Sequence, residues 1–358
     1  MVILHIAQLY NRPYSGVDTV VPKHLFYQQQ KEDVALINLT GIEVEGVKNQ
    51  LHVSNVKDLK SLPEPFDKPN VVIFHEVYRP KFLKIAKYFK KQGVPYAIVP
   101  HCSLTANAQK AKRIKKIIGN IFFFNRFVLN ASAIQCLSEK EKTETKFKVE
   151  KFVCPNGVEI PAFAPKVNTK DEMNIVFIGR MNIFHKGLDI LIDAVFAIKN
   201  YLIENKVSIS LYGPDENGSI QLLNKQICEH NIEKLIKIKE PVMGEEKKRV
   251  LLNADVFIQT SRFEGIPTGV LEALSYGLPC VVTEGTTFSR IISEFNAGWG
   301  AYDSSESVSS AIKKAVENKN QLNVFSKNAR KLVEENFSWD LVADNTLRKY
   351  REKWANKI

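Results

Sequence analysis

The sequence lacks the features that would place it among membrane-spanning, secreted or zinc-binding proteins. Its longest apolar run, residues 117–129, is broken by glycine, asparagine and arginine and is too short to cross a bilayer. The N-terminal segment has no basic stretch and indicates a β-strand rather than a signal peptide. The 5 cysteines are scattered, with no Cys-x-x-Cys pair, which excludes zinc-ligand spacing and predicts free thiols in a reducing cytoplasm.

Two nucleotide-site motifs are also missing. There is no Asp-x-Asp, so we do not expect carboxylates that clamp a metal–diphosphate complex, and we predict no metal site and no cofactor. A complete Gly-x-Gly-x-x-Gly is absent, which argues against NAD-type binding. What remains is a chain of 358 residues, 44% hydrophobic and 25% charged, which is long enough for two globular domains.

Acidic residues are absent from a long segment of the first half. None lies between Glu76 and Glu139, whereas this segment contains twelve basic residues and accounts for the whole net charge of +11. Such an excess predicts an anionic partner for the first half of the chain. The basic residues are Arg79, Lys81, Lys84, Lys87, Lys90, Lys91, Lys110, Lys112, Arg113, Lys115, Lys116 and Arg126.

Part of this segment, residues 108–125, has isoleucines on one helical face and lysines on the other. A helix that covers a sheet with solvated lysines would have this pattern, and so would a helix that contacts an anionic membrane or acceptor. The lack of acids favours the second interpretation, with contact through residues 79–126. A nucleic-acid partner is not expected despite the pI of 9.2, since the segment lacks interleaved aromatic residues.

Apolar runs alternate with helical patterns along the chain, which predicts parallel sheets covered by helices on both faces. The expected strands are Val2–Ala7, Val34–Leu39, Asn70–Phe74, Tyr96–Val99, Ala133–Cys136, Met173–Ile178, Val207–Tyr212, Ile236–Ile238, Val256–Gln259 and Pro279–Thr283. The expected helices are Pro80–Lys91, Ala108–Asn125, Gly187–Asn200, Ile220–His230, Glu245–Leu252, Thr268–Tyr276, Ser305–Val316 and Ser338–Trp354.

Proline and glycine gather in residues 154–167, which indicates a linker, and the alternation then restarts. We therefore predict an α/β fold of two Rossmann-like domains whose parallel sheets face a central cleft. The predicted domains are residues 1–160 and 161–337, with a final helix in 338–358. Ligands of such sheets bind outside the carboxyl ends of the strands.

Two of the expected strand ends carry glycines or cations that suit phosphate. Gly16, in the loop after the first strand, would let the backbone approach a phosphate, although an ordinary β–α turn would also explain it. Arg180 and Lys186 follow the first strand of the second half and would neutralise a diphosphate, although two solvated surface cations are the alternative.

The most informative motif is residues 264–272, in which Glu264 precedes a helix and Glu272 lies one turn inside it. We expect Thr268 to be the N-cap of this helix, so that free backbone N–H groups form an anion site. Two carboxylates beside an anion site suit a ligand that combines phosphate with sugar hydroxyls. A helix cap and a surface acid would explain either glutamate alone. A single histidine after strand 96–99, His101, is either structural or part of the site.

Taken together, these motifs resemble the GT-B retaining glycosyltransferases of glycosyltransferase family 4. The resemblance rests on Gly-Arg-x5-Lys-Gly at 179–187, Glu-x7-Glu at 264–272, Pro-Asn-Gly-Val at 155–158 and Phe-Ser-Trp at 337–339. It covers nearly the whole chain and implies the GT-B fold, with the last helix returning to the N-terminal domain. The chain departs from the family at three places. Its first loop has one glycine where two or more are usual, Glu159 stands where Asp is common, and Gly285-Thr286 stands where a Gly-Gly turn is usual.

The resemblance also implies roles for individual residues. Arg180 and Lys186 would hold the donor diphosphate, Glu272 the ribose hydroxyls, and Glu264 the donor-sugar hydroxyls. His101 would face the donor sugar, and the catalytic set would be His101, Glu264, Arg180 and Lys186. The remaining donor-binding positions would be Gly16 and the backbone of Gly265, Ile266, Pro267, Thr268, Gly269 and Val270.

The function implied is that of a hexosyltransferase-type enzyme (EC 2.4) that uses a nucleotide-diphosphate sugar, with UDP as the expected nucleotide. It would transfer the sugar with retention to a glycan or lipid-diphosphate-linked acceptor in bacterial surface polysaccharide synthesis. We expect a cytoplasmic protein, peripheral on the inner leaflet. The alternatives are a nucleotide-sugar epimerase or phosphorylase on the same fold and a nucleic-acid-binding protein.

Overall fold

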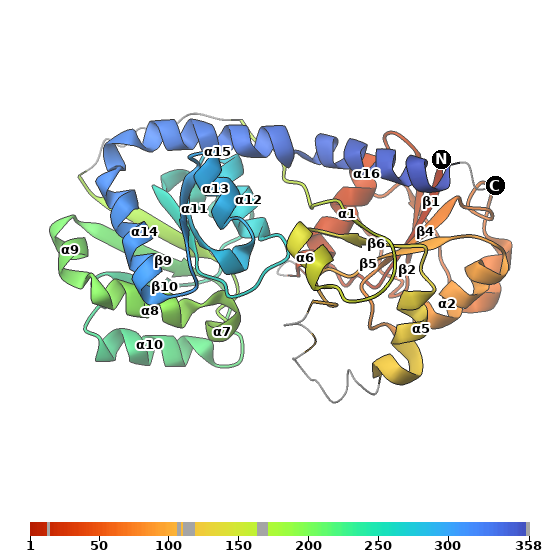
Figure 1. Cartoon of the computed structure of the whole chain (residues 1–358), viewed down its shortest axis with the longest axis horizontal. Coiled ribbons are helices and arrows are strands. Elements are labelled where there is room, and N and C mark those ends of the chain that lie inside the picture. The colour runs from red at the N-terminus through yellow and green to blue at the C-terminus, as the bar shows by residue number, and fades with distance from the viewer. Residues whose placement is uncertain (13–14, 106–108, 110–118, 163–170, 356–358) are drawn as a thin grey trace. The chain divides into compact units, whose positions relative to one another are not determined.

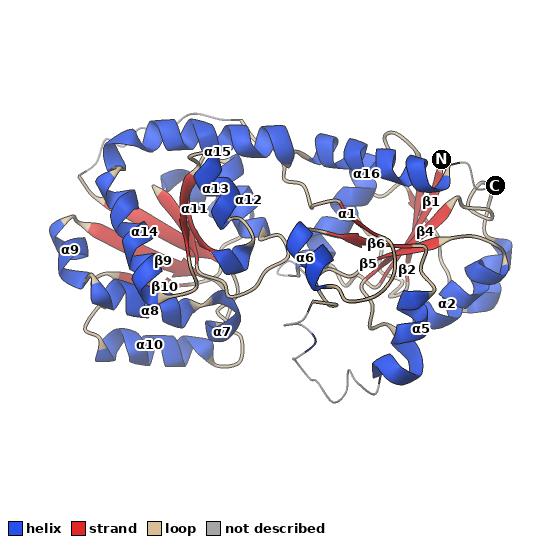
Figure 2. Ribbon diagram, viewed as in Figure 1, coloured by secondary structure: helices blue, strands red, loops and turns tan. Residues whose placement is uncertain are grey.

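The computed structural model describes all residues except 13–14, 106–108, 110–118, 163–170 and 356–358, and the chain divides into two compact units (Figure 1). Unit 1 comprises Met1–Gly157 and Trp339–Ile358, and unit 2 comprises Val158–Ser338. Each unit contains one sheet in which all strand pairings are parallel, and helices flank the strands (Figure 2). The predicted α/β class with two parallel sheets is confirmed.

The sheet of unit 1 has the strand order β3-β2-β1-β4-β5-β6-β7. Its strands are β1 (Val2–Ala7), β2 (Asp33–Asn38), β3 (Asn49–Gln50), β4 (Val71–His75), β5 (Tyr96–Val99), β6 (Ala133–Cys136) and β7 (Lys151–Val153). Its helical elements are α1 (Gly16–Gln28), η1 (Val56–Ser61), α2 (Pro80–Lys91), η2 (Asn120–Phe124), α5 (Asn125–Leu129), α6 (Glu139–Glu144) and α16 (Trp339–Trp354). The central strands are buried almost throughout, which is why they are mostly apolar and rich in valine and isoleucine.

The basic segment of unit 1 is described only in part. Helix α2 has the predicted bounds and buries Phe82, Ile85, Ala86 and Phe89, which leaves its lysines on the outer face. The five basic residues of 110–116 lie outside the described residues, and so does most of the helix expected over 108–125. The described end of that segment differs from the expectation, because residues 120–124 form a π-helical turn and α5 continues to Leu129. No described helix is both long and apolar enough to cross a bilayer.

The sheet of unit 2 has the order β10-β9-β8-β11-β12-β13. Its strands are β8 (Met173–Ile178), β9 (Val207–Tyr212), β10 (Ile236–Lys239), β11 (Val256–Gln259), β12 (Cys280–Thr283) and β13 (Gly298–Ala301). Its helical elements are α7 (Ile183–Lys186), α8 (Leu188–Ala197), α9 (Lys199–Glu204), α10 (Ser219–Glu229), α11 (Gly244–Asn253), α12 (Thr268–Ser275), η3 (Glu284–Thr286), α13 (Ser289–Glu294), α14 (Ser305–Glu317), η4 (Lys319–Gln321) and α15 (Leu322–Asn336).

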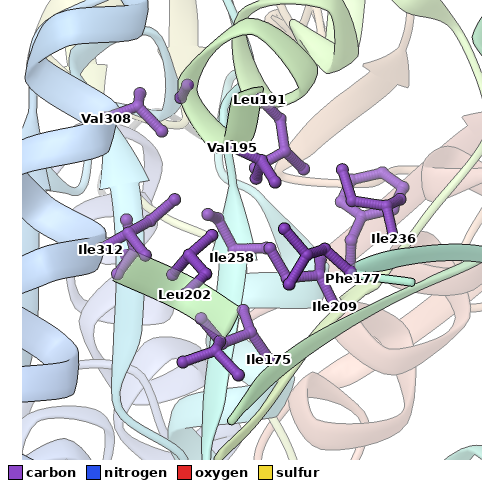
Figure 3. Close-up of a cluster of buried hydrophobic side chains, with 14 of the residues drawn as sticks. Ile175, Phe177, Leu191, Val195, Leu202, Ile209, Ile236, Ile258, Val308 and Ile312 are labelled. Carbon is purple, nitrogen blue, oxygen red and sulfur yellow. The ribbon is translucent and has the colours of Figure 1, made fainter. Parts of the chain in front are cut away.

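The core of unit 2 lies between the sheet and the helices on one side of it. Ile175 and Ile258, from neighbouring central strands, pack with Leu191 and Val195 of α8 and with Ile312 of α14 (Figure 3). The predicted helix over Gly187–Asn200 is wrong at both ends: Gly187 is a left-handed junction between α7 and α8, and a new helix starts at Lys199. This close-packed core gives the strand ends a rigid base.

Helix α16 completes unit 1 from the far end of the sequence. Tyr350 and Trp354 are fully buried and lie with ring centroids 6.2 and 6.3 Å from that of Phe152 on β7. The Tyr350 hydroxyl donates a hydrogen bond to Gln135 on β6. At the first residue of the helix, the Trp339 ring would lie 2.6 Å from a Cβ on Gly157, so only glycine fits at position 157. Unit 1 therefore needs both of its separate chain segments.

Replacing Trp354 by alanine should destabilise unit 1 selectively. A fully buried tryptophan cut to alanine costs about 3–5 kcal/mol, or roughly a hundredfold or more in the opening equilibrium. Hydrogen–deuterium exchange should show faster exchange in β6 and β7 and unchanged exchange in unit 2. The control is Arg348→Ala, an exposed position on the same helix, which should leave both units unchanged. Equal exchange rates in wild type and Trp354→Ala would contradict the packing role of α16.

Candidate functional site

Three loops of unit 2 meet at the carboxyl ends of β8, β11 and β12, which are neighbours in the sheet. A close backbone contact joins the first two loops at Gly187, which has φ of +59°. A Cβ on Gly187 would lie 2.0 Å from the carbonyl oxygen of Thr260, and the Thr260 hydroxyl donates to the Gly187 carbonyl at 2.8 Å. The backbones can approach this closely only because residue 187 is glycine.

Arg262 fastens the same two loops with its side chain. Its guanidinium binds both carboxylate oxygens of Asp189, at 2.8 and 2.6 Å, and donates to the carbonyl of Phe184 at 3.0 Å. A bidentate pair fixes direction as well as distance. The third loop joins through Glu264, whose backbone N–H donates to the Gly285 carbonyl at 2.7 Å. The site is thus built on three loops that hold one another.

Glu264 is the centre of this arrangement. Its Oε1 atom forms an ion pair with Lys186 and accepts hydrogen bonds from Gln259 at 3.1 Å and Ser261 at 3.0 Å. Burial acts to raise the pKa of Glu264, but Lys186, His185 and the hydrogen bond from Ser261 together outweigh it and hold this pKa below its ordinary value. Glu264 is therefore a carboxylate at neutral pH. None of these contacts uses Oε2, so that oxygen retains the capacity to accept from a ligand.

His185 lies next to this pair and is neutral. Burial lowers the pKa of His185, although Glu264, whose carboxylate is 3.8 Å away, acts to raise it. Its Nε2–H donates to the Phe263 carbonyl at 2.9 Å, and its ring stacks on that of Phe263 with centroids 4.5 Å apart. Lys186 is therefore the cation that balances Glu264.

The two predicted phosphate-binding cations differ in their surroundings. The Lys186 side chain is only 13% exposed and shares its space with Glu264, whereas that of Arg180 is 41% exposed and binds Glu216 at 2.6 Å. Neither is the open cation that the sequence suggests. Each nonetheless keeps N–H donors beyond the one that its carboxylate uses.

Helix α12 opens directly beside Glu264, with one correction to the expected cap. Pro267 is the N-cap, since its extended backbone precedes the helix and its carbonyl accepts from Val270 and Leu271. Thr268 is therefore the first helical residue and cannot cap the helix with its hydroxyl. The N–H groups of Thr268 and Gly269 donate to no described residue, which leaves two donors at the positive end of the helix dipole.

The other predicted carboxylate, Glu272, lies farther along α12. It pairs with Lys247 of α11, and both side chains are about one third exposed. The sequence assigned no role to Lys247, because it lies 25 residues away in a helix without a motif. This pair lies on the side of α12 that faces the helix after β10.

A pocket of about 440 Å³ lies at the ends of the two outer strands β9 and β10. Its lining includes Gly213, Pro214 and Glu240. Gly213 also touches the loop that carries Arg180, since a Cβ there would lie 1.7 Å from the carbonyl oxygen of Gly179. The pocket, Arg180 and the Glu264 cluster therefore follow one another along a single edge of the sheet.

The remaining predicted residues, Gly16 and His101, belong to unit 1. Gly16 starts α1 behind the N-cap Ser15, and nothing lies within 4 Å of a Cβ built on it, so packing does not require a glycine there. His101 follows β5 and has φ of +47°. Its Nε2 atom lies 3.2 Å from Nδ1 of His75, a residue that the sequence analysis did not select.

A side chain at residue 187 should loosen the whole site. Gly187→Ala combines a left-handed backbone with a steric overlap, for which we expect a loss of roughly 3 kcal/mol in the free energy of unfolding. Gly218→Ala is the matched control, because Gly218 has φ of +74° but open space around its Cβ, and should cost about 1 kcal/mol. Urea denaturation of both variants would measure this difference, and equal losses would contradict the close approach.

The part of the chain that carries this site is similar to a known protein family. Residues 160–332 match the family model described as Glycosyl transferases group 1. A galactosyltransferase of Escherichia coli, named UDP-Gal:alpha-D-GlcNAc-diphosphoundecaprenol alpha-1,3-galactosyltransferase, is 25% identical over 311 residues, which cover 80% of this chain and 78% of the relative.

Solved structures agree on the fold over nearly the full length. The Anabaena protein HepE in complex with UDP has a TM-score of 0.73 at 15% identity, covering 98% of this chain and 100% of HepE. Sucrose-phosphate synthase from Thermosynechococcus elongatus has a TM-score of 0.75 at 14% identity, covering 99% and 100%. The chain is therefore a glycosyltransferase with the GT-B fold, and its residues 160–332, slightly less than half of its length, match the glycosyl transferases group 1.

Proposed function

We propose that this glycosyltransferase is a retaining enzyme of family 4 that transfers a hexose from a UDP-sugar to a lipid-diphosphate-linked glycan. The observation that carries the proposal is the meeting of Lys186, Glu264 and the open end of α12 on three interlocked loops. This arrangement offers a cation, two backbone donors and a carboxylate acceptor within one cluster. A sugar diphosphate is the ligand that needs all three.

The diphosphate would bind between Lys186 and the N-terminus of α12. The N–H groups of Thr268 and Gly269 are fixed before the ligand arrives, so they stabilise the negative charge of the leaving diphosphate without reorganisation. Arg180 would exchange Glu216 for a phosphate oxygen, which its exposed position permits. Cations and a helix dipole would thus supply the charge stabilisation that a metal ion supplies in other enzymes.

The sugar and the nucleoside would lie on opposite sides of the diphosphate. Oε2 of Glu264 would accept a hydrogen bond from a donor-sugar hydroxyl, and Glu272 would accept from the ribose. The pocket at the ends of β9 and β10 would receive the base, since it adjoins the loop of Arg180. UDP is favoured over other nucleotides because HepE is described in complex with UDP and the E. coli relative is named for a UDP-sugar.

The proposed reaction is a front-face displacement. The acceptor hydroxyl oxygen forms a bond to the anomeric carbon while the bond from that carbon to the diphosphate oxygen breaks. The departing phosphate takes the hydroxyl proton, so no protein nucleophile is needed. Retention follows from the family resemblance and agrees with the alpha linkage in the name of the E. coli relative. By the same resemblance His101 would face the donor sugar.

Removing either cation should weaken UDP binding and turnover. For Lys186→Ala we expect a roughly 10–100-fold lower affinity for UDP, the usual value of a hydrogen bond to a charged group, and about 10²–10³-fold lower kcat/KM. Arg180→Ala should have a smaller effect of the same sign, because its side chain is more exposed. Isothermal titration with UDP measures the affinity without an acceptor.

The control for both variants is Lys206→Ala, which removes an exposed lysine paired with Asp171 in the same unit. It should bind UDP like the wild type. Product analysis after incubation with the UDP-sugar alone separates transfer from epimerisation, which would yield an isomerised donor without acceptor. Wild-type UDP affinity in Lys186→Ala and Arg180→Ala would refute the assigned diphosphate site.

The acceptor would approach unit 1, which carries the basic excess. Lys84, Lys87 and Lys91 are exposed at helical spacing on one face of α2. Such a face suits the anionic inner leaflet, where an acceptor linked to a lipid diphosphate would be anchored. The E. coli relative is named for an acceptor of this kind, a diphosphoundecaprenol-linked sugar.

Vesicle flotation tests the membrane contact. The triple variant Lys84→Gln, Lys87→Gln and Lys91→Gln should partition roughly 100-fold more weakly onto vesicles with phosphatidylglycerol, at about 1 kcal/mol for each lysine. The effect should shrink as salt rises. The control is Lys234→Gln, Lys237→Gln and Lys331→Gln, three exposed lysines of unit 2. Equal binding to neutral and anionic vesicles would count against the membrane proposal.

A further inference from the structure

A chain of four polar side chains crosses the interior of unit 1. Gln28, the last residue of α1, has Oε1 3.0 Å from Nε2 of His5 on β1. Nδ1 of His5 lies 2.9 Å from Nε2 of His75 at the end of β4, and Nδ1 of His75 lies 3.2 Å from Nε2 of His101. The first three residues are at least 98% buried. This hydrogen-bonded series therefore connects the buried amide of Gln28 with His101, which follows strand β5.

The three histidines of this hydrogen-bonded series, His5, His75 and His101, are neutral at ordinary pH. Burial lowers the pKa of His5 to about 3 and that of His101 to about 3, and burial with the neighbouring histidines lowers the pKa of His75 well below its usual value. A neutral imidazole carries one proton, so one ring nitrogen donates and the other accepts. Each contact in the chain must then hold one proton, and all contacts must point in the same direction.

Gln28 sets that direction. Its Oε1 can only accept, so His5 must carry its proton on Nε2 and accept on Nδ1. His75 then carries its proton on Nε2 and accepts from Nε2–H of His101. Nδ1 of His101 is left as an unprotonated acceptor. An amide turned the other way would reverse every proton and leave an N–H at that position.

His101, the last residue of the hydrogen-bonded series, has an unusual backbone conformation. His101 and Cys102 have φ of +47° and +64°, a region that costs non-glycine residues about 1–2 kcal/mol each. A hydrogen bond from the interior holds this turn, because Oε1 of the buried Glu141 accepts from the Cys102 N–H at 2.6 Å. His101 itself is partly exposed, and among the described residues none forms a hydrogen bond with its Nδ1. The fold thus fixes one ring nitrogen inside and leaves the other for a ligand.

We propose that Gln28, acting through His5 and His75, is a positioning residue that keeps Nδ1 of His101 unprotonated, so that His101 accepts a hydrogen bond from a sugar hydroxyl. The identity of that hydrogen-bond donor rests on the proposed function. The control of the tautomer rests on the geometry of unit 1 alone. The residue types suit this task, since Oε1 of the glutamine offers an acceptor and each histidine passes the direction from one ring nitrogen to the other.

Nitrogen NMR of the ligand-free protein with ¹⁵N-labelled histidine tests the tautomer directly. Long-range ¹H–¹⁵N spectra distinguish protonated from unprotonated ring nitrogens, and His101→Asn assigns the signal of His101. We expect Nε2–H and a bare Nδ1 in the wild type. Gln28→Met removes the acceptor while keeping the shape, and His101 should then show both tautomers. A wild-type His101 with its proton on Nδ1 would overturn the proposal.

Two further variants separate positioning from packing. His75→Gln keeps one donor and one acceptor in the middle of the chain and should retain the wild-type tautomer of His101. His24→Gln alters a buried histidine whose hydrogen bond is to Asn156 and not to His5, His75 or His101. It should leave the tautomer of His101 unchanged. A tautomer of His101 that is indifferent to Gln28→Met, or that responds equally to His24→Gln, would refute control by Gln28.

Turnover of the UDP-sugar completes the test. Gln28→Met should lower kcat/KM about 2–10-fold, the value of one neutral hydrogen bond, whereas His75→Gln should keep most of the wild-type value. A wild-type protein that turns over no nucleotide sugar would contradict the proposed function but not the tautomer result. A mixed tautomer in Gln28→Met with undiminished turnover would refute the role of Nδ1 toward the substrate.

Discussion

The backbone contact between Gly187 and Thr260 is the constraint on which the site of unit 2 depends. It brings the loop after β8 against the loop after β11, and Lys186 reaches Glu264 only because the residue after it has no side chain. The pair of Arg262 with Asp189 then fixes the direction of the same contact. Lys186 and Glu264 lie on the two loops that this contact joins, so the geometry of their pair depends on backbone packing as well as on charge.

The charged side chains of this site neutralise one another within the protein. Lys186 is paired with Glu264, Arg180 with Glu216, and Lys247 with Glu272, so each charged side chain that is predicted to contact the donor on unit 2 has a protein partner. Leaving any of these charges unpaired in a partly buried place would be costly. A diphosphate would therefore bind by exchange, with its oxygens replacing carboxylates that already hold the cations in position. Such exchange lowers the net gain from each contact but keeps the side chains preorganised.

Much of the fold could be predicted from the sequence, and the elements that could not be predicted share physical causes. Buried parallel strands such as β1, β8 and β11 are mostly apolar and rich in valine and isoleucine, and they were predicted with their observed bounds. Strand β13 reads Gly-Trp-Gly-Ala and has no such signal, because its place at the edge of the sheet comes from pairing with β12. The motif residues were identifiable from spacing, whereas the partners of Lys186 and Arg180 lie 78 and 36 residues away and are set by topology. His5 was visible only as a polar interruption in an apolar strand.

The return of α16 to unit 1 has a consequence for how the polypeptide acquires its structure during synthesis. Unit 2 is one continuous stretch, so it can fold as soon as Ser338 has left the ribosome. Unit 1 is interrupted by that stretch, and Phe152 stays uncovered until Tyr350 and Trp354 are made. The domain that is translated first is therefore completed last, and its exposed apolar surface must be shielded from aggregation for the time that some 200 residues take to emerge.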